Sequence, residues 1–312
     1  MDYICGITFA PFVPGKCYNT KEAKESFIKM VESTHANFVI FVPNALQDTP
    51  QSEVITMGEE SVNEEELTEM ILFAKEQGLR VAIKPTVNCK NGTWRAFINF
   101  FDEDVVCEPK WGNWFKSYTD FQLRYAKVAE ATKCDMFIAG CEMVMSERRE
   151  KEWRQLIKDI KSVYSGPVSY NTDKYQEHNV KWWDAVDVIS SSGYYPVDKW
   201  EEQLDRIEKV VKKYNKPFFF AETGCMSTEG SKFVPNNWCL DGDSDLEGQA
   251  EWYKEMIKAC EKRDWVGGMC FWDWPIKLYN PKDADKYKKY ELYAKPACDV
   301  VKEYYGKKQG IR

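Results

Sequence analysis

Histidine is scarce in this sequence, since His35 and His178 are the only two among 312 residues. Imidazole is a common zinc ligand, and the H-E-x-x-H motif is missing as well, so a histidine-rich zinc site is excluded. The motifs G-x-G-x-x-G and G-x-x-x-x-G-K-[ST] do not occur, which excludes the usual nucleotide signatures. No apolar run approaches the roughly 20 residues that a membrane-spanning helix requires. We therefore expect no metal, no cofactor and no membrane partner.

Basic residues are in the minority, with 43 Lys and Arg against 50 Asp and Glu and a formal net charge of −7. This balance argues against nucleic acid as a partner. The first residues, Met1-Asp2-Tyr3, lead directly into an apolar run without the basic segment of a signal peptide. The eleven cysteines include no C-x-x-C pair, and a disulfide framework is expected mainly in small secreted chains. We therefore predict a reduced, cytoplasmic protein.

Strand-like apolar runs alternate with amphipathic helical stretches along the whole chain. The predicted strands are Tyr3–Phe9, Asn37–Val42, Arg80–Lys84, Cys134–Gly140, Pro167–Tyr170, Val186–Ser190, Pro217–Ala221 and Gly268–Trp272. The predicted helices lie near 20–33, 63–77, 112–132, 150–163, 199–214, 245–263 and 286–304, with a possible short one at Val180–Trp183. Eight strands separated by helices favour a closed (β/α)8 barrel over an open sheet. We therefore predict an α/β fold, a single TIM-barrel domain spanning residues 1–312.

Two of these strands lead into a glutamate. The run Asp135–Cys141 precedes Glu142, and the run Lys216–Ala221 precedes Glu222. A carboxylate is costly to desolvate, so its position at the C-terminal end of a buried barrel strand indicates a functional role. If both strands belong to one barrel, the two carboxylates can converge over one sugar ring, which is the geometry of glycoside hydrolysis. Either glutamate alone could be a salt-bridged helix cap, but two at matching strand ends weaken that explanation.

Aromatic rings, amides and charged groups are expected at the same ends of the other strands. Flat aromatic faces pack on the C–H faces of sugars, and amides and carboxylates bind hydroxyl groups, so this mixture predicts an oligosaccharide or polysaccharide partner. Phosphorylated ligands would instead need a glycine-rich turn at this end, whereas Gly267-Gly268 precedes the eighth strand. The candidate substrate-binding residues are Asn44, Lys84, Asn88, Trp94, Arg95, Asn171, Tyr194, Tyr195, Trp272, Asp273 and Trp274.

Several candidates also have structural explanations. Trp272 and Trp274 are two positions apart on a strand end, so both can face the same side, and one of them is expected to form a sugar platform. Arg95 could serve only to fix a loop, and Lys84 could serve only to neutralise carboxylates inside the barrel. Four other tryptophans occupy helical positions and are expected to pack in the outer layer: Trp182, Trp183, Trp200 and Trp252.

With these residues assembled, the chain resembles glycoside hydrolase family 113, within the clan A retaining glycosidases. The resembling stretches are Gly6–Phe12, Lys84-Pro85, Gly92–Arg95, Ile138–Glu142, Lys216–Gly224 and Phe271–Trp274. The resemblance implies a (β/α)8 barrel with β-1,4-mannanase or β-mannosidase-like activity, with Glu142 as acid/base and Glu222 as nucleophile. Two positions depart from the pattern: Cys141 stands where many clan A enzymes have Asn, and Thr86 stands where a histidine is common in the family.

The implied mechanism is double displacement. Glu222 attacks the anomeric carbon while Glu142, held protonated, protonates the leaving oxygen, and water then hydrolyses the glycosyl-enzyme. We expect Tyr194 or Tyr195 to donate a hydrogen bond to Glu222, Lys84 or Arg95 to supply nearby positive charge, and Glu142 to be the less hydrated carboxyl group.

Three alternatives remain open at this stage. The same mechanism could act on another β-glycoside, such as a xylan- or glucan-derived oligosaccharide. The barrel could bind sugar without cleaving it. Finally, Lys84 could act as the Schiff-base amine of a lyase or aldolase.

Overall fold

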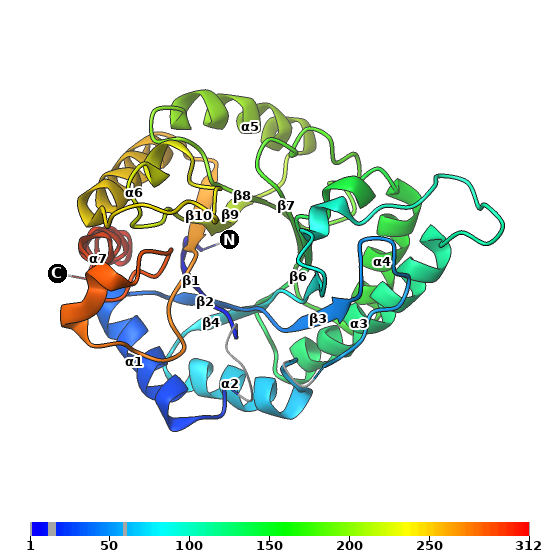
Figure 1. The fold of residues 1–312 in the computed structure, drawn as a ribbon, viewed down its shortest axis with the longest axis horizontal. Helices are drawn as coiled ribbons and strands as arrows, with labels where there is room; N and C mark the ends of the chain where they lie inside the picture. The colour runs from blue at the N-terminus through cyan, green and yellow to red at the C-terminus, as the bar shows by residue number, and fades with distance from the viewer. Residues whose placement is uncertain (1, 12–16, 59–60, 312) are drawn as a thin grey trace.

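The computed structural model describes residues 2–11, 17–58 and 61–311, and its centre is a closed barrel of eight parallel strands (Figure 1). The strands follow one another around the barrel in the order β1-β10-β9-β8-β7-β6-β4-β2. Each predicted strand coincides with a barrel strand to within two residues at either end. The barrel strands are β1 (Ile4–Phe9), β2 (Phe38–Phe41), β4 (Arg80–Ile83), β6 (Met136–Cys141), β7 (Val168–Thr172), β8 (Val188–Ser192), β9 (Phe218–Thr223) and β10 (Val266–Phe271). The predicted (β/α)8 barrel is confirmed, although Phe12 of the expected motif lies outside the described residues.

A second, two-stranded sheet was not predicted. It pairs β3 (Asn44–Gln47) with β5 (Thr86–Cys89) in parallel, beyond the ends of β2 and β4. Pro43 and Pro85 interrupt the barrel ladder at these points because proline has no N–H to donate. The extra sheet carries the chain from the barrel rim towards the loop that contains Trp94 and Arg95.

Seven α-helices surround the barrel within the described part of the chain (Figure 1). Three of them begin at a side chain that accepts a backbone N–H of the first turn: Thr20 before α1, Asn63 before α2 and Asp245 before α6. The helices are α1 (Lys21–Thr34), α2 (Glu64–Glu76), α3 (Trp111–Ala131), α4 (Glu150–Val163), α5 (Trp200–Tyr214), α6 (Leu246–Glu261) and α7 (Pro296–Gln309).

Two helix predictions were wrong in detail. The last helix was expected from 286, but α7 begins at Pro296, where the fixed backbone of proline suits the first turn. The segment before it holds the 3-10 helix η4 (Pro281–Lys286) instead. Val180–Trp183 forms no helix, because turns alone connect β7 to β8. Trp182 and Trp183 are completely buried there and fill the space that a helix would otherwise occupy.

The core has two layers, as the alternation of side chains along barrel strands requires. One layer fills the barrel and includes Ile40, Ile138 and Phe219. The other lies between the strands and the helices and contains most of the buried aromatic residues. The filled barrel is therefore a rigid support, and the loops at the C-terminal ends of its strands are left to build a site.

Two further findings concern the chain as a whole. No helix in the described ranges is both long enough and apolar enough to cross a bilayer. All eleven cysteines are free thiols, and nine of them are buried, with only Cys107 and Cys239 exposed.

Candidate active site

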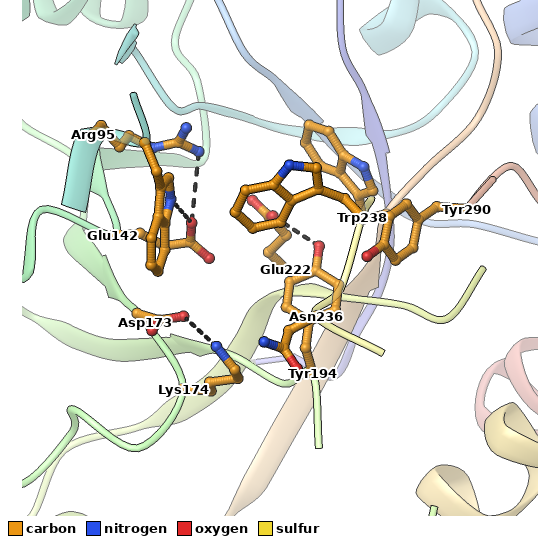
Figure 2. A pocket seen from close by; sticks show the side chains of 11 residues that line it. Arg95, Glu142, Asp173, Lys174, Tyr194, Glu222, Asn236, Trp238 and Tyr290 are labelled. Atoms are coloured by element: carbon orange, nitrogen blue, oxygen red, sulfur yellow. Dashed lines mark hydrogen bonds and ion pairs between the residues drawn. The ribbon is translucent and has the colours of Figure 1, made fainter. Parts of the chain in front are cut away.

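A cavity of about 200 Å³ opens at the C-terminal ends of the barrel strands (Figure 2). Both predicted catalytic glutamates line it, one from the end of β6 and one from β9. The full lining is Trp94, Arg95, Glu142, Asp173, Lys174, Tyr194, Glu222, Asn236, Trp238, Trp272 and Tyr290. The two carboxyl groups therefore share one space, together with indole and phenol rings.

Glu222 is held by donors on both of its oxygens. The Lys84 ammonium donates to Oε2 at 2.6 Å. The Tyr194 hydroxyl donates to Oε1 at 2.8 Å (Figure 2). Burial by itself would raise the pKa of Glu222, but the positive charges of Lys84 and Arg95 outweigh it and place that pKa below its ordinary value. Glu222 is therefore an ionised carboxylate at neutral pH, and Tyr194 is the tyrosine that bonds it.

Glu142 follows directly after β6, with a left-handed backbone of φ 54°. Its Oε1 accepts a hydrogen bond from Ser192 Oγ at 2.7 Å, and its Oε2 accepts one from Trp94 Nε1 at 3.2 Å. The Arg95 guanidinium lies 3.7 Å from the same Oε2 (Figure 2). These three groups all present hydrogen-bond donors to the carboxyl group.

The expectation that Glu142 would be the less hydrated of the two was wrong. The side chains of Glu142 and Glu222 are equally exposed, at 8% each. What distinguishes them is the distance to a cation, because Lys84 lies 2.6 Å from Glu222 whereas the nearest guanidinium nitrogen lies 3.7 Å from Glu142.

A buried chain of hydrogen bonds connects the two carboxyl groups below the cavity. The Asn171 Oδ1 atom accepts from Lys84 Nζ at 3.1 Å, and its Nδ2 donates to Ser192 Oγ at 3.0 Å. Ser192 in turn donates to Glu142, and Lys84 donates to Glu222. Ser192 was not predicted, because a serine within a strand carries no distinctive sequence signal.

Cys141 lies at the end of β6, with its thiol close to Glu222. Its Sγ is 3.5 Å from Glu222 Oε2 and 3.8 Å from Asn171 Oδ1. Burial raises the pKa of this thiol well above its ordinary value, so it remains protonated and donates weakly to Glu222. The cysteine is therefore a neutral hydrogen-bond donor beside Glu222.

Arg95 supports the strand end that carries Glu142. It belongs to the 3-10 helix η1 (Arg95–Phe97), its Nε donates to the Cys141 carbonyl at 3.0 Å, and a terminal nitrogen donates to Asn88 Oδ1 at 3.0 Å. Asn88 therefore orients Arg95 and does not itself line the cavity.

Four predicted substrate-binding residues line the cavity, and four do not reach it or its supporting network. Trp94, Arg95, Tyr194 and Trp272 contribute to the lining, and Lys84, Asn88 and Asn171 support it from below or behind. Tyr195, Trp274, Asn44 and Asp273 lie outside the lining.

These four side chains have other surroundings. The Tyr195 hydroxyl donates to Glu177 at 2.6 Å, on the opposite side of the chain from its neighbour Tyr194. Trp274 lies beyond the end of β10, so strand alternation no longer applies, and its indole is buried and donates to Ser26. Asn44 is buried in β3. Burial and the charge of Glu291 raise the pKa of Asp273 to about 8.

Five lining residues were not proposed as binding residues from the sequence: Asp173, Lys174, Asn236, Trp238 and Tyr290. Trp238 reaches the cavity from the long connection between β9 and α6 (Figure 2). It packs edge-on against Trp94, with ring centroids 5.8 Å apart. Asp173 and Lys174 directly follow β7, whereas Asn236, Trp238 and Tyr290 lie in long connections, too far from a strand end for that rule to find them.

The donor chemistry of this site suits an uncharged polar ligand. Within the described residues, no group of three or more His, Cys, Asp or Glu side chains is placed to hold a metal ion. The cavity combines two carboxyl groups with aromatic faces, which can bind and protonate a glycosidic bond.

Residues 7–295 match the model of Glycoside Hydrolase Family 113. The chain belongs to this family. Among solved structures, a GH113 β-1,4-mannanase described as a complex is 52% identical, with a TM-score of 0.96, and the match covers 98% of this chain and 99% of that one. The GH113 β-mannanase AaManA from Alicyclobacillus acidocaldarius, in complex with ManMIm, is 37% identical with a TM-score of 0.95, over 99% of this chain and 98% of that one.

More distant structures share the fold of this GH113 chain. A β-D-glucuronidase from Dictyoglomus thermophilum is 16% identical with a TM-score of 0.67, and the match covers 98% of this chain but 51% of the other. At this identity the likeness concerns the barrel alone. A search of curated proteins found no match.

Proposed function

We propose that this chain is a β-1,4-mannanase that cleaves mannan or manno-oligosaccharides by double displacement. The observation that carries the proposal is the pair of glutamates lining one cavity, one paired with a lysine and the other surrounded by donors. The choice of mannan is supported by the GH113 β-1,4-mannanases, which are 52% and 53% identical over 98% of this chain.

In the first step, Glu222 attacks the anomeric carbon. Lys84 and Tyr194 hold both of its oxygens, so the carboxylate is ionised and has a fixed orientation. Glu142 gives its proton to the glycosidic oxygen as the bond to the leaving sugar breaks. The product is a glycosyl-enzyme ester on Glu222.

In the second step, Glu142 is a carboxylate and takes a proton from water, which attacks the anomeric carbon and releases Glu222. The Trp94 indole N–H and the Arg95 guanidinium face Glu142 Oε2 and would stabilise this ionised form. Two inversions give net retention of the β configuration.

The indole faces of Trp272 and Trp238 and the ring of Tyr290 supply aromatic surface around the bound sugar. Asp173 and Asn236 supply hydrogen-bonding groups for its hydroxyls. The reduced, cytoplasmic setting expected from the cysteine pattern belongs to the proposal too, and it favours short oligosaccharides as substrates.

The Schiff-base alternative finds no support in the electrostatics. Burial by itself would lower the pKa of Lys84, but the acidic groups Cys141 and Glu222 raise it above its ordinary value. Of these two, Glu222 is the one ionised at neutral pH. Lys84 is therefore a permanent ammonium, and a Schiff-base lysine must be neutral to attack.

The test uses one substrate series and two variants. Glu222→Ala should lose cleavage of manno-oligosaccharides, and azide should restore turnover of an activated aryl β-mannobioside with an α-glycosyl azide as product. Glu142→Ala should keep most of kcat/KM on the activated substrate and lose it on manno-oligosaccharides, because kcat/KM reports formation of the glycosyl-enzyme, in which only the poor leaving group needs a proton. Retained activity of Glu222→Ala without azide would overturn the assignment.

Substrate class is tested separately, with mannan-, xylan- and glucan-derived oligosaccharides of equal length. Cleavage of the xylan or glucan series in preference to mannan would place the enzyme on another β-glycoside. Binding without product in all three series would identify a sugar-binding barrel.

A further inference from the structure

A second buried glutamate, Glu147, lies behind Glu142 and takes no part in the proposed reaction. It is 4% exposed, follows the 3-10 helix η2 (Val144–Ser146) and does not line the cavity. Its Oε1 accepts hydrogen bonds from the hydroxyls of Tyr170 at 2.8 Å and Thr172 at 2.7 Å. None of the described residues bonds its Oε2. A buried carboxyl group that is only half satisfied is costly, so a structural or functional gain must offset it.

The Tyr170 hydroxyl connects Glu147 to the catalytic turn. It accepts the backbone N–H of Met143 at 3.1 Å, and Met143 is the residue directly after Glu142. Tyr170 is completely buried, and its ring lies 4.8 Å from the rings of both Trp153 and Trp182. The ring cannot move away, so the hydroxyl occupies a fixed position between Glu147 and the turn.

The turn itself needs such support. Glu142 adopts φ 54°, and a left-handed conformation in a residue other than glycine costs of order 1–3 kcal/mol and persists only where its surroundings enforce it. The N–H of Glu142 donates to the Asn171 carbonyl at 2.8 Å, and the N–H of Met143 donates to Tyr170. These two bonds fix the backbone on which the Glu142 carboxyl is carried.

The helix η2 is anchored from the same side. The Trp153 indole donates to the Ser146 carbonyl, and the Trp182 indole donates to the Glu147 carbonyl, both at 3.0 Å. Glu147 is thus immobile at its backbone as well as at its side chain. The group that receives the Tyr170 hydroxyl is itself rigid, as a positioning device requires.

We propose that Glu147 is a positioning residue for Glu142, acting through Tyr170 on the turn at Met143. This inference rests on the proposed role of Glu142 as acid/base. The chemistry of Glu147 suits a neutral acceptor, because burial raises the pKa of this carboxyl to about 8 and its Oε1 accepts both hydroxyl protons. A glutamine amide oxygen can accept the same two bonds, whereas leucine can accept neither.

The test compares kcat/KM on mannotetraose with kcat/KM on 2,4-dinitrophenyl β-mannobioside, whose leaving group needs no proton. General acid assistance contributes about 10²–10⁴-fold, so a misplaced Glu142 in Glu147→Leu or Tyr170→Phe should cost about 10- to 100-fold on mannotetraose. The same variants should lose about threefold or less on the aryl substrate, because the nucleophile is untouched. Glu147→Gln, in contrast to Glu147→Leu, should cleave mannotetraose at close to the parent rate.

Thr172→Val is the matched control, since it removes the other hydrogen bond to Glu147 Oε1 but leaves the link from Tyr170 to Met143 in place. It should cleave mannotetraose at close to the parent rate. Equal losses of Tyr170→Phe on both substrates, or a Thr172→Val loss as large as that of Tyr170→Phe, would overturn the positioning role.

Glu142→Ala, measured in parallel, separates the two proposals. If it lacks the leaving-group dependence, the acid/base assignment itself fails. If it shows that dependence and Tyr170→Phe does not, only the role of Glu147 fails. Tyr170→Phe keeps the buried ring, so this comparison remains available even if Glu147→Leu does not fold.

Discussion

Replacing Lys84 by methionine should move the acidic limb of the activity profile towards higher pH. The Lys84 ammonium lies 2.6 Å from Glu222 and is completely buried. With an effective dielectric constant of about 20, Coulomb's law gives about 6 kcal/mol for this pair. Arg95 and the Tyr194 hydroxyl remain in Lys84→Met and retain part of that stabilisation. We therefore expect a net change of about 3–4 kcal/mol, which corresponds to about 2 to 3 pH units at 1.36 kcal/mol each.

The direction of this pH shift follows from the effect that Lys84 has on the pKa of Glu222 in the parent enzyme. The pKa of Glu222 lies below its ordinary value, so its ion pair stabilises the fold above the unfolded pKa, and this stabilisation is lost as the pH falls through the folded pKa. In Lys84→Met the pKa of Glu222 should lie above its ordinary value, so the variant should lose stability as the pH rises instead. The assay is kcat/KM for an aryl β-mannobioside between pH 3 and 9, with thermal unfolding at pH 4 and pH 7.

Arg206→Met provides a matched control, because Arg206 pairs with a completely buried carboxylate, Glu177, at the same distance of 2.6 Å. Losing either cation should cost about 3–5 kcal/mol of stability at neutral pH. Only Lys84→Met should shift the acidic limb of kcat/KM. An unshifted limb in Lys84→Met, or the same shift in both variants, would refute the view that Lys84 sets the ionisation of the nucleophile.

Three further predictions concern other parts of the structure. Tyr194→Phe removes a hydrogen bond to the buried Glu222 carboxylate, which contributes about 1.5–3 kcal/mol, so the free energy of unfolding at neutral pH should fall by about that amount, and kcat should fall because the carboxylate loses its fixed orientation; an unchanged Tm together with an unchanged kcat would contradict this. Iodoacetamide at neutral pH should label the exposed Cys107 and Cys239 without loss of activity, because Cys141 is a buried neutral thiol, and peptide mapping checks this. The raised pKa of Glu147, about 8 against 4.5, means that the native state holds a proton that the unfolded state releases, so stability should fall between pH 4.5 and 8 by up to about 5 kcal/mol. Glu147→Gln should flatten that dependence in thermal unfolding, and an identical slope in the variant would show that Glu147 does not titrate there.

The barrel could be predicted from the sequence because its signals are local and repeated. Each buried strand is a short apolar run, and most helices begin at a capping side chain or an acidic first turn. The small sheet of β3 and β5 could not be predicted in this way, because Pro43 and Pro85 read as the ends of β2 and β4. A short helix was expected between β7 and β8 at Val180–Trp183. Turns form this connection instead, although Trp182 and Trp183 are buried as the side chains of a packed helix would be.

Only site residues at or near the ends of barrel strands could be predicted from the sequence. Glu142 directly follows β6, Glu222 lies at the end of β9 and Tyr194 comes two residues after β8, so the barrel rule places them at one rim. Tyr195 and Trp274 were wrong as cavity residues, the first because neighbouring side chains point to opposite sides and the second because it lies beyond the end of β10. Trp238 and Tyr290 enter the cavity from distant loops, and no local pattern reports where such a loop returns.

The two carboxyl groups show how one barrel gives different electrostatic surroundings to chemically identical side chains of equal exposure. The two side chains are equally exposed, so burial does not distinguish their surroundings. The position of the nearest cation does. Lys84 is directly bonded to Glu222, whereas Glu142 receives only neutral donors at hydrogen-bond distance and a guanidinium at 3.7 Å. Because Asn171 and Ser192 connect the two sides, a proton that leaves Glu142 in the proposed reaction changes the charge at one end of a continuous hydrogen-bonded network whose other end is Glu222. Asn171→Ala would break that network in its middle without removing either carboxyl group, so kcat/KM for manno-oligosaccharides should fall, and an unchanged kcat/KM would show that the connection between the two sides does not matter for the reaction.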